Sequence, residues 1–265
     1  MPSTATAPLL FPGHVITLDS RDETEVLAIQ HRLNEVGIAV DETGEFEKTT
    51  AEAVKLFQAR FIDLDGLPLE VDGIVGPLTW AGLFGPESVP GLIKPSSPLL
   101  AAVLEFAATQ IGVMEQPLGS NRGPEVDEYI RSVGLDPKGK FAWCVVFMFF
   151  CFEKAAGKLG RSNPMIKTAG VLDHWNRAGA KGIQRITAKE AGQTPSLVKP
   201  GQLFVIRTSG INGHTGFVER VTGGKMVTIE GNTNESGSPE GTGVFRRTGR
   251  KIVSINKGFI DYNSL

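Results

Sequence analysis

The sequence contains two cysteines, Cys144 and Cys151, and they are the first candidates for chemistry. Cys144 follows Trp143 at the expected start of a strongly apolar helix, and a helix N-terminus stabilises a reactive thiolate. Cys151 lies two turns deeper among phenylalanines, where burial is expected to keep a thiol neutral. Two turns separate the residues by roughly 10 Å along the helix axis, too far for a disulfide. We expect two free thiols, with Cys144 as the nucleophile if either reacts; the alternative is that both are small core residues.

A thiol nucleophile needs a base, and His214 is the best candidate among the four histidines. Its neighbours Gly213, Thr215 and Gly216 are small, which leaves room for the imidazole to meet a partner and a substrate. The remaining histidines are expected elsewhere: His14 in an N-terminal tail, His31 in a first domain, and His174 on a helix in a packed or surface role.

Glu230 and Asn232 are candidates to orient His214, depending on the hairpin that joins their strands through Thr222-Gly223-Gly224. A two-residue loop, Gly223-Gly224, would place His214 and Glu230 on opposite faces of the sheet, because side chains alternate along a strand. A three-residue loop would place His214, Glu230 and Asn232 on one face, within side-chain reach. A catalytic role for the group therefore requires an odd-length loop or a bulge.

The elements that must position these residues fall into a helical part and a mixed part. Periodicity and capping predict three short helices, over 26–33 with Thr24 as its cap, 49–61 capped by Thr49 or Thr50, and 77–83 with Pro77 in its first turn. Further helices are expected over 99–112, 124–133, 142–158 and 167–177, and strands at 203–206, 217–221, 226–229 and 252–255. Helices followed by strands indicate an α+β domain with an antiparallel sheet, preceded by a small three-helix bundle.

Composition predicts how the chain is divided. We expect a tail over 1–18, a helical domain over 19–86, a Pro-, Gly- and Ser-rich linker over 87–97 and the α+β domain over 98–265. Residues 21–85 carry 5 Lys and Arg against 13 Asp and Glu, a net charge of −8, whereas residues 98–265 carry 21 against 14, a net of +7. A change of sign between halves is typical of separate units. The basic half favours an anionic partner such as cell wall, nucleic acid or a membrane surface, with ordinary solvated surface as the alternative.

Three motifs of the second half resemble those of CHAP domains, the cysteine- and histidine-dependent amidohydrolases and peptidases of cell-wall lysis. They are Trp143-Cys144, Gly213–Val218 and Glu230-Gly231-Asn232, in the family's order of Cys, His and acid. Lys199–Leu203 is similar to the family's Pro-Gly-Asp stretch, with Gln202 in place of Asp, and Glu115 with Ser120–Pro124 is similar to the lead-in of phage-type members. The similarity covers 98 to about 262 and implies a papain-like fold with helices packed on an antiparallel sheet.

The first half resembles the three-helix peptidoglycan-binding domain. The similarity rests on two paired phrases, Asp41–Phe46 and Asp72–Thr79, and on single residues along the helices, among them Gln30, Leu33, Gly37, Thr49, Ala53, Phe57, Gln58 and Trp80. Two independent resemblances therefore point to the same polymer.

Together the resemblances imply a peptidoglycan hydrolase that cuts an amide of the wall peptide and lyses bacteria, either as an N-acetylmuramoyl-L-alanine amidase or as a stem-peptide endopeptidase. Cys144 would be the nucleophile, His214 the base, and Glu230 the orienting acid with Asn232 in support. The backbone N–H of Cys144 and a second donor, Gln110 or Glu115, would hold the oxyanion. The residues implied in substrate binding are Glu115, Asn121, Trp143, Asp72 and Trp80. No cofactor or metal is implied, because no Asp-x-Asp-rich calcium loop precedes Cys144.

The expected partner is bacterial peptidoglycan, with no nucleic acid and no membrane insertion, since the longest apolar run, Phe141–Phe152, is well short of the ~20 residues of a span. Residues 1–20 lack the features of a signal peptide, so we expect synthesis in the cytoplasm and action in the wall or periplasm after release or non-classical export. A phage endolysin or an exported effector fits, the latter with an immunity or delivery protein as a further partner, and a monomer is expected.

Two alternatives stay open. A non-catalytic wall-binding protein with a degenerate enzyme fold would leave His214 far from the Cys144 sulfur. An intracellular cysteine protease or acyltransferase would leave the first domain unexplained.

Overall fold

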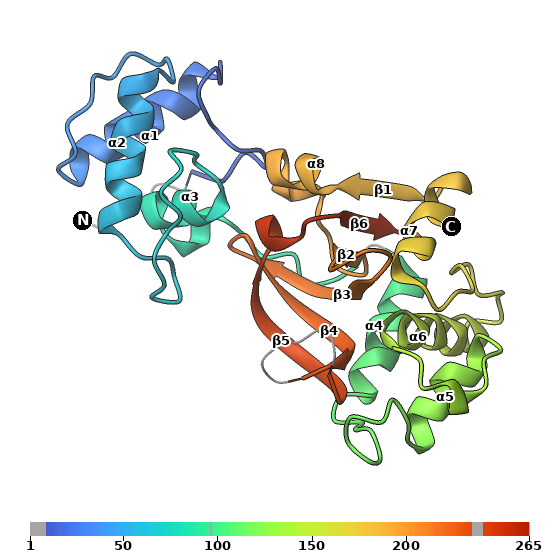
Figure 1. Cartoon of the computed structure of the whole chain (residues 1–265). Helices are drawn as coiled ribbons and strands as arrows, with labels where there is room; N and C mark the ends of the chain where they lie inside the picture. Colours follow the sequence, from blue (N-terminus) through green and yellow to red (C-terminus); the bar gives the residue numbers. More distant parts are fainter. Residues whose placement is uncertain (1–8, 96, 235–240, 265) are drawn as a thin grey trace, which may run out of the picture. The chain divides into compact units, whose positions relative to one another are not determined.

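The computed structural model describes residues 9–95, 97–234 and 241–264, which divide into two compact units (Figure 1). The described residues up to 91 form most of the first unit, and those from 92 onward form most of the second. Within the described chain, no helix combines the length and the apolar character needed to cross a membrane.

Three helices build the first unit: α1 (Glu23–Glu35), α2 (Lys48–Arg60) and α3 (Pro77–Phe84), followed by the 3-10 turn η1 (Pro86–Ser88). Pro77 opens α3 as expected, since its missing N–H is not needed in a first turn. The predicted caps of the other two helices are wrong. Asp22, not Thr24, accepts a hydrogen bond from the Glu25 N–H, and α2 begins after Glu47 with no side-chain cap.

Two buried glutamines explain why the segments Asp41–Phe46 and Asp72–Thr79 resemble each other. Gln30 accepts a hydrogen bond from the Gly44 N–H (2.9 Å) and donates one to the Thr50 hydroxyl (2.9 Å). Gln58 does the same with the Gly73 N–H (2.9 Å) and the Thr79 hydroxyl (3.3 Å). Both glycines have positive φ, 76° and 78°, which favours glycine at the turn. Each glutamine therefore ties one glycine turn to the helix that follows it.

Part of the predicted N-terminal tail belongs to the first unit's core. Ile16 is fully buried and exchanges two backbone hydrogen bonds with Val75, at 3.1 and 2.8 Å. The Phe11 ring meets the Trp80 ring edge-on at 5.9 Å. The prediction of a loose tail is thus wrong for residues 11–16, because Phe11 and Ile16 pack in the core of this unit. Residues 1–8 lie outside the described chain. Ser88, placed in the predicted linker, is also buried.

The second unit begins with helices. They are α4 (Pro98–Thr109), α5 (Pro124–Ser132), α6 (Cys144–Lys158) and α7 (Val171–Ala180), with the short η2 (Pro137–Gly139), α8 (Ala188–Gln193) and η3 (Pro195–Leu197) between or after them. Figure 1 shows α4, α5 and α6 gathered together. Every residue of α6 from Cys144 to Phe152 is buried, as its all-round apolar sequence predicts.

A six-stranded antiparallel sheet completes the second unit, in the order β1-β6-β2-β3-β4-β5. The strands are β1 (Gln184–Thr187), β2 (Leu203–Arg207), β3 (Gly213–Thr222), β4 (Lys225–Thr233), β5 (Gly243–Lys251) and β6 (Gly258–Asp261). The predicted α+β class is confirmed, and so are the strands that became β2, β3 and β4. The strand expected at 252–255 is wrong, since Ile252–Ser254 forms the 3-10 turn η4.

Gln202 shows why this chain departs from the Pro-Gly-Asp pattern. Its buried amide donates to the Asp261 carboxylate of β6 (2.9 Å) while its carbonyl oxygen accepts from the Lys199 N–H (3.0 Å). An aspartate at 202 could not donate to Asp261 and would set two carboxylates together. The amide therefore suits the neighbour it has in this chain.

Candidate active site

Cys144 is the first residue of α6 and is buried, with 4% of the residue exposed. The first hydrogen bond of the helix runs from the Phe147 N–H to the Trp143 carbonyl (2.9 Å). The N–H groups of Cys144, Val145 and Val146 therefore precede the hydrogen-bond ladder, at the end of the helix that favours negative charge. This position suits a thiolate and an oxyanion formed beside it.

Cys151 lies in the same helix in a different environment. It is completely buried, and this burial raises the pKa of its thiol well above the usual value. Both cysteines are free, as predicted. A neutral, enclosed thiol is unreactive, so the distinction between the two cysteines holds in the structure.

His214 occupies the second position of β3, where its ring is nearly fully buried. Its Nε2 lies 2.7 Å from Oε2 of Glu230. Nδ1 is buried and has no partner of good hydrogen-bond geometry in the described chain. Burial alone would lower the pKa of His214, but the hydrogen-bonding and charge interactions with Cys144 and Glu230 outweigh it and raise the pKa to about 9. With Nε2 engaged by Glu230, Nδ1 is the ring nitrogen left to meet the thiol.

His214 and Glu230 lie on the same face of the sheet, although the loop of the hairpin does not have three residues. Strands β3 and β4 are joined by Gly223-Gly224 alone, and both glycines have positive φ (54° and 80°), as in a type I′ turn. An unbroken ladder from this loop would put His214 and Glu230 on opposite faces. Their 2.7 Å contact therefore requires a one-residue shift in register between the loop and Glu230, the bulge alternative.

Gly216 makes room for this contact. A Cβ at position 216 would lie 2.7 Å from Cγ of Glu230 and 2.8 Å from the Phe204 ring. Phe204 and Gly216 are paired across β2 and β3, and the Phe204 ring packs against the His214 ring with centroids 5.8 Å apart. Glycine is thus required at position 216 because Glu230 and Phe204 approach its backbone closely.

Two residues absent from the predicted site hold Glu230. The Thr228 hydroxyl donates to Oε1 (2.5 Å), and Arg250 of β5 donates from Nε to Oε1 (3.0 Å) and from Nη2 to both oxygens (2.9 and 3.0 Å). Burial alone would raise the pKa of Glu230, but the hydrogen bond with His214 and the charge of Arg250 lower it to about 2. Arg250 lies in a strand that the alternation of residues 243–251 does not reveal, so the sequence offered no signal for it.

Asn232 does not support the imidazole in the structure. It is buried, has a left-handed φ of 55° and lies where the pairing of β4 with β5 shifts between Glu230 and Thr233. No hydrogen bond joins its side chain to His214 within the described chain. A shift in pairing at this point interrupts the regular alternation of side chains that the prediction assumed.

Glu115 and Trp143 form a buried link, to which half-buried Asn121 adds its backbone N–H. The Trp143 indole, fully buried, donates to Oε1 of Glu115 (2.8 Å), and the Asn121 N–H donates to Oε2 (3.0 Å). Glu115 therefore has both oxygens occupied, and as a carboxylate it offers no donor for an oxyanion. The predictions of substrate contact by Trp143 and of an oxyanion donor at Glu115 are wrong, because both groups serve to hold the start of α6.

The other predicted contacts are likewise engaged within the chain. Gln110 accepts from the Tyr129 hydroxyl (2.8 Å) and donates to the Thr109 hydroxyl (2.9 Å). Trp80 is fully buried, so the prediction that it contacts the wall is wrong. Asp72 is exposed, and its Oδ1 accepts from Gln58 (2.8 Å) as part of the repeated turn.

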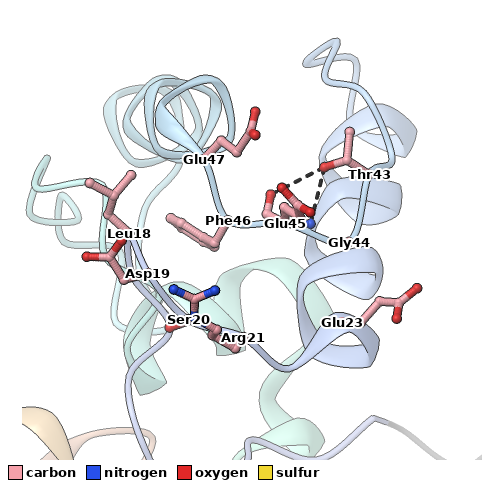
Figure 2. Close-up of a pocket in the computed structure, with 10 residues that line it drawn as sticks. All are labelled: Leu18, Asp19, Ser20, Arg21, Glu23, Thr43, Gly44, Glu45, Phe46 and Glu47. Atoms are coloured by element: carbon pink, nitrogen blue, oxygen red, sulfur yellow. Dashed lines mark hydrogen bonds between the residues drawn. The ribbon is translucent and has the colours of Figure 1, made fainter.

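The first unit carries a hollow of about 660 Å³ on its surface, shown in Figure 2. Its lining combines Arg21, which points into it, with acidic and apolar side chains: Leu18, Asp19, Glu23, Glu45, Phe46 and Glu47. Neither Asp72 nor Trp80 lines it.

A second hollow, of about 630 Å³, lies in the second unit around Trp175, Arg185 and Lys257, apart from Cys144 and His214. In the described chain, no cluster of three or more His, Cys, Asp or Glu could hold a metal ion.

Comparison with known families agrees with this geometry. Residues 136–232 match the CHAP domain, and residues 22–83 match the peptidoglycan binding domain. The chain thus carries a peptidoglycan-binding domain followed by a CHAP domain, a class typically made of cysteine- and histidine-dependent amidohydrolases or peptidases. The combination supports a peptidoglycan hydrolase. No curated protein and no solved structure matched the chain.

Proposed function

We propose that this protein cleaves an amide bond of the peptidoglycan peptide with Cys144 as nucleophile and His214 as base and acid. The observation that carries the proposal is the buried His214 ring, whose Nε2 meets Glu230 at 2.7 Å and whose pKa is raised by Cys144 and Glu230. A protonated imidazole beside a thiol at a helix start is the arrangement of a thiolate–imidazolium pair. A degenerate, non-catalytic fold has no need of it.

The reaction runs in two halves. The Cys144 thiolate attacks the amide carbonyl, and the first-turn N–H groups of α6 stabilise the oxyanion. His214 gives its proton to the leaving amine, which leaves an acyl thioester on Cys144. Neutral His214 then takes a proton from water as the resulting hydroxide attacks the thioester. The intermediate separates into the carboxylic acid and the Cys144 thiolate, and the proton stays on His214, which restores the ion pair. Glu230 keeps the ring oriented and its charge balanced throughout.

The first unit would supply attachment to the wall, and the expected result of cleavage is bacterial lysis. An N-acetylmuramoyl-L-alanine amidase and a stem-peptide endopeptidase use the same thiol chemistry, so both remain within the proposal. Action in the wall or periplasm, as a released phage lysin or an exported effector, follows from the substrate.

Digestion of purified peptidoglycan tests the nucleophile. Wild type should release soluble fragments, Cys144→Ala should release none above background, and Cys151→Ala serves as the matched control that retains activity. Equal release by wild type and Cys144→Ala would falsify the assignment. Masses of the fragments separate the two activities: free glycan and intact peptides indicate the amidase, whereas shortened or uncrosslinked peptides still joined to sugar indicate the endopeptidase.

A further inference from the structure

We propose that Arg250 is a positioning residue of the active site: it holds Glu230 ionised and fixed so that His214 and Cys144 can form their ion pair. This inference rests on the proposed function of Cys144, His214 and Glu230. Arg250 lies outside the residues that match the CHAP domain, 136–232.

The contacts of Arg250 leave Glu230 little freedom. Three hydrogen bonds of 2.9–3.0 Å join the guanidinium to both carboxylate oxygens, and the Thr228 hydroxyl adds a fourth hydrogen bond. The Glu230 side chain is fully buried and that of Arg250 is 16% exposed. The guanidinium also lies 4.8 Å from the centroid of the Phe204 ring, which packs against His214. Arg250 therefore supports both the carboxylate and one wall of the imidazole site.

A bulge in β5 allows Arg250 to reach Glu230. Met226 pairs with Arg250, but Thr228 pairs with Arg247, so β5 holds one extra residue between them. Gly249 in that interval has a φ of 78°, the left-handed conformation common in bulges. On a regular strand, residues 246 and 250 would share a face. With the bulge, Arg246 pairs with Glu219 (2.8 and 2.9 Å) and Arg250 pairs with Glu230.

The charges of the site explain what Arg250 contributes. Cys144 thiolate, His214 imidazolium, Glu230 carboxylate and Arg250 guanidinium alternate in sign, and together they are neutral. Without Arg250, two buried anions would share one imidazolium, and a buried excess charge favours uptake of a proton. The thiolate would then be lost at a higher pH than in wild type.

The experiment measures the alkylation rate of Cys144 against pH in the full-length protein, in a Cys151→Ala background that leaves one thiol, together with kcat and KM on peptidoglycan. Arg250→Met should move the acid limb of alkylation upward by about one pH unit, a roughly tenfold loss of rate below the limb. Arg250→Lys, which keeps charge but loses the planar fork, should leave the limb in place and lower kcat more than it raises KM. Arg246→Met is the matched control, and its profile should overlay that of wild type.

A second pair of variants guards against misfolding and against failure of the enzyme proposal. Glu230→Gln removes the buried anion, so adding Arg250→Met to it should cause no further shift of the limb. An unshifted limb in folded Arg250→Met, or an equal shift in both backgrounds, would overturn the positioning role. If wild type digests no peptidoglycan but the limb still shifts in Arg250→Met alone, the positioning role stands and the proposed substrate is wrong.

Discussion

The charges of His214 and Glu230 depend on neighbouring side chains that a local sequence pattern does not show. His214 and Glu230 are both almost completely buried, and burial by itself would neutralise each of them. Each instead stabilises the charge of the other, with Cys144 on one side and Arg250 and Thr228 on the other. Shifts of this kind, in opposite directions within one contact, are typical of functional sites.

Activity should therefore have an alkaline limit set by His214. Its pKa of about 9 means that the imidazolium, the acid for the leaving amine, is lost as pH rises through that value. We expect kcat/KM for peptidoglycan to fall above about pH 9, and Cys144→Ala to lower the His214 pKa, measured by NMR titration of the ring. A ring that titrates near 6.5 in wild type would contradict this assignment.

The same pKa values predict how stability depends on pH. The folded-state pKa of His214 is raised, so its stabilising contribution is complete below about pH 6.5 and is lost as pH rises through about 9. The pKa of Glu230 is depressed, so its contribution is complete above about pH 4.5 and is lost as pH falls through about 2. Denaturant unfolding should show Glu230→Gln with a flatter acid limb than wild type. Equal acid limbs would argue against the pairing.

Gly216 offers a steric test of the His214–Glu230 contact. In Gly216→Ala the new Cβ would fall 2.7 Å from Cγ of Glu230, so the carboxylate must move, and we expect kcat/KM to drop roughly 10- to 100-fold. Gly157→Ala in α6 is the control, since no atom lies within 4 Å of its added Cβ. That change should leave activity intact and stabilise the helix by about 0.5–1 kcal/mol. Equal activity of the two variants would show that the contact is dispensable.

At the scale of elements, irregular pairing decides where the functional side chains point. The contact of His214 with Glu230 requires a register shift between β3 and β4, and the bulge in β5 separates Arg250 from Arg246. The hydrophobic pattern predicts β2, β3 and β4, but no residue type in β3 or β4 marks the shift. Such offsets depend on how neighbouring strands and α6 pack together.

In the first unit, the two turns held by Gln30 and Gln58 depend strongly on a single side chain each. Gln58 is buried and makes hydrogen bonds with the Gly73 N–H, the Thr79 hydroxyl and Asp72. Gln58→Ala should therefore lower the free energy of unfolding of this unit by about 2–4 kcal/mol, because it leaves buried polar groups unpaired. Exposed Arg60→Ala on the same helix should change it by less than about 0.5 kcal/mol. Chemical denaturation followed by tryptophan fluorescence of Trp80 compares them; equal losses would contradict the role of the turn.

For the whole molecule, we propose that the first unit attaches the protein to the wall and that the second unit carries out the chemistry. Cys144, His214, Glu230 and Arg250 all belong to the second unit, which has its own apolar core. Deletion of residues 1–91 should therefore weaken sedimentation with insoluble peptidoglycan and slow its digestion, while cleavage of soluble wall peptide fragments stays within about twofold of wild type. Unchanged binding to insoluble wall after the deletion would remove the targeting role of the first unit.

The sequence by itself determined the α+β class, the helical first unit and the different surroundings of Cys144 and Cys151, because periodicity, helix ends and local composition are properties of neighbouring residues. Tertiary structure alone decided that Trp80 and Trp143 are buried, that His214 contacts Glu230, and that Arg250 holds Glu230. These depend on register shifts and on contacts between distant segments, whose free energies come from packing and charge pairing that no local stretch encodes.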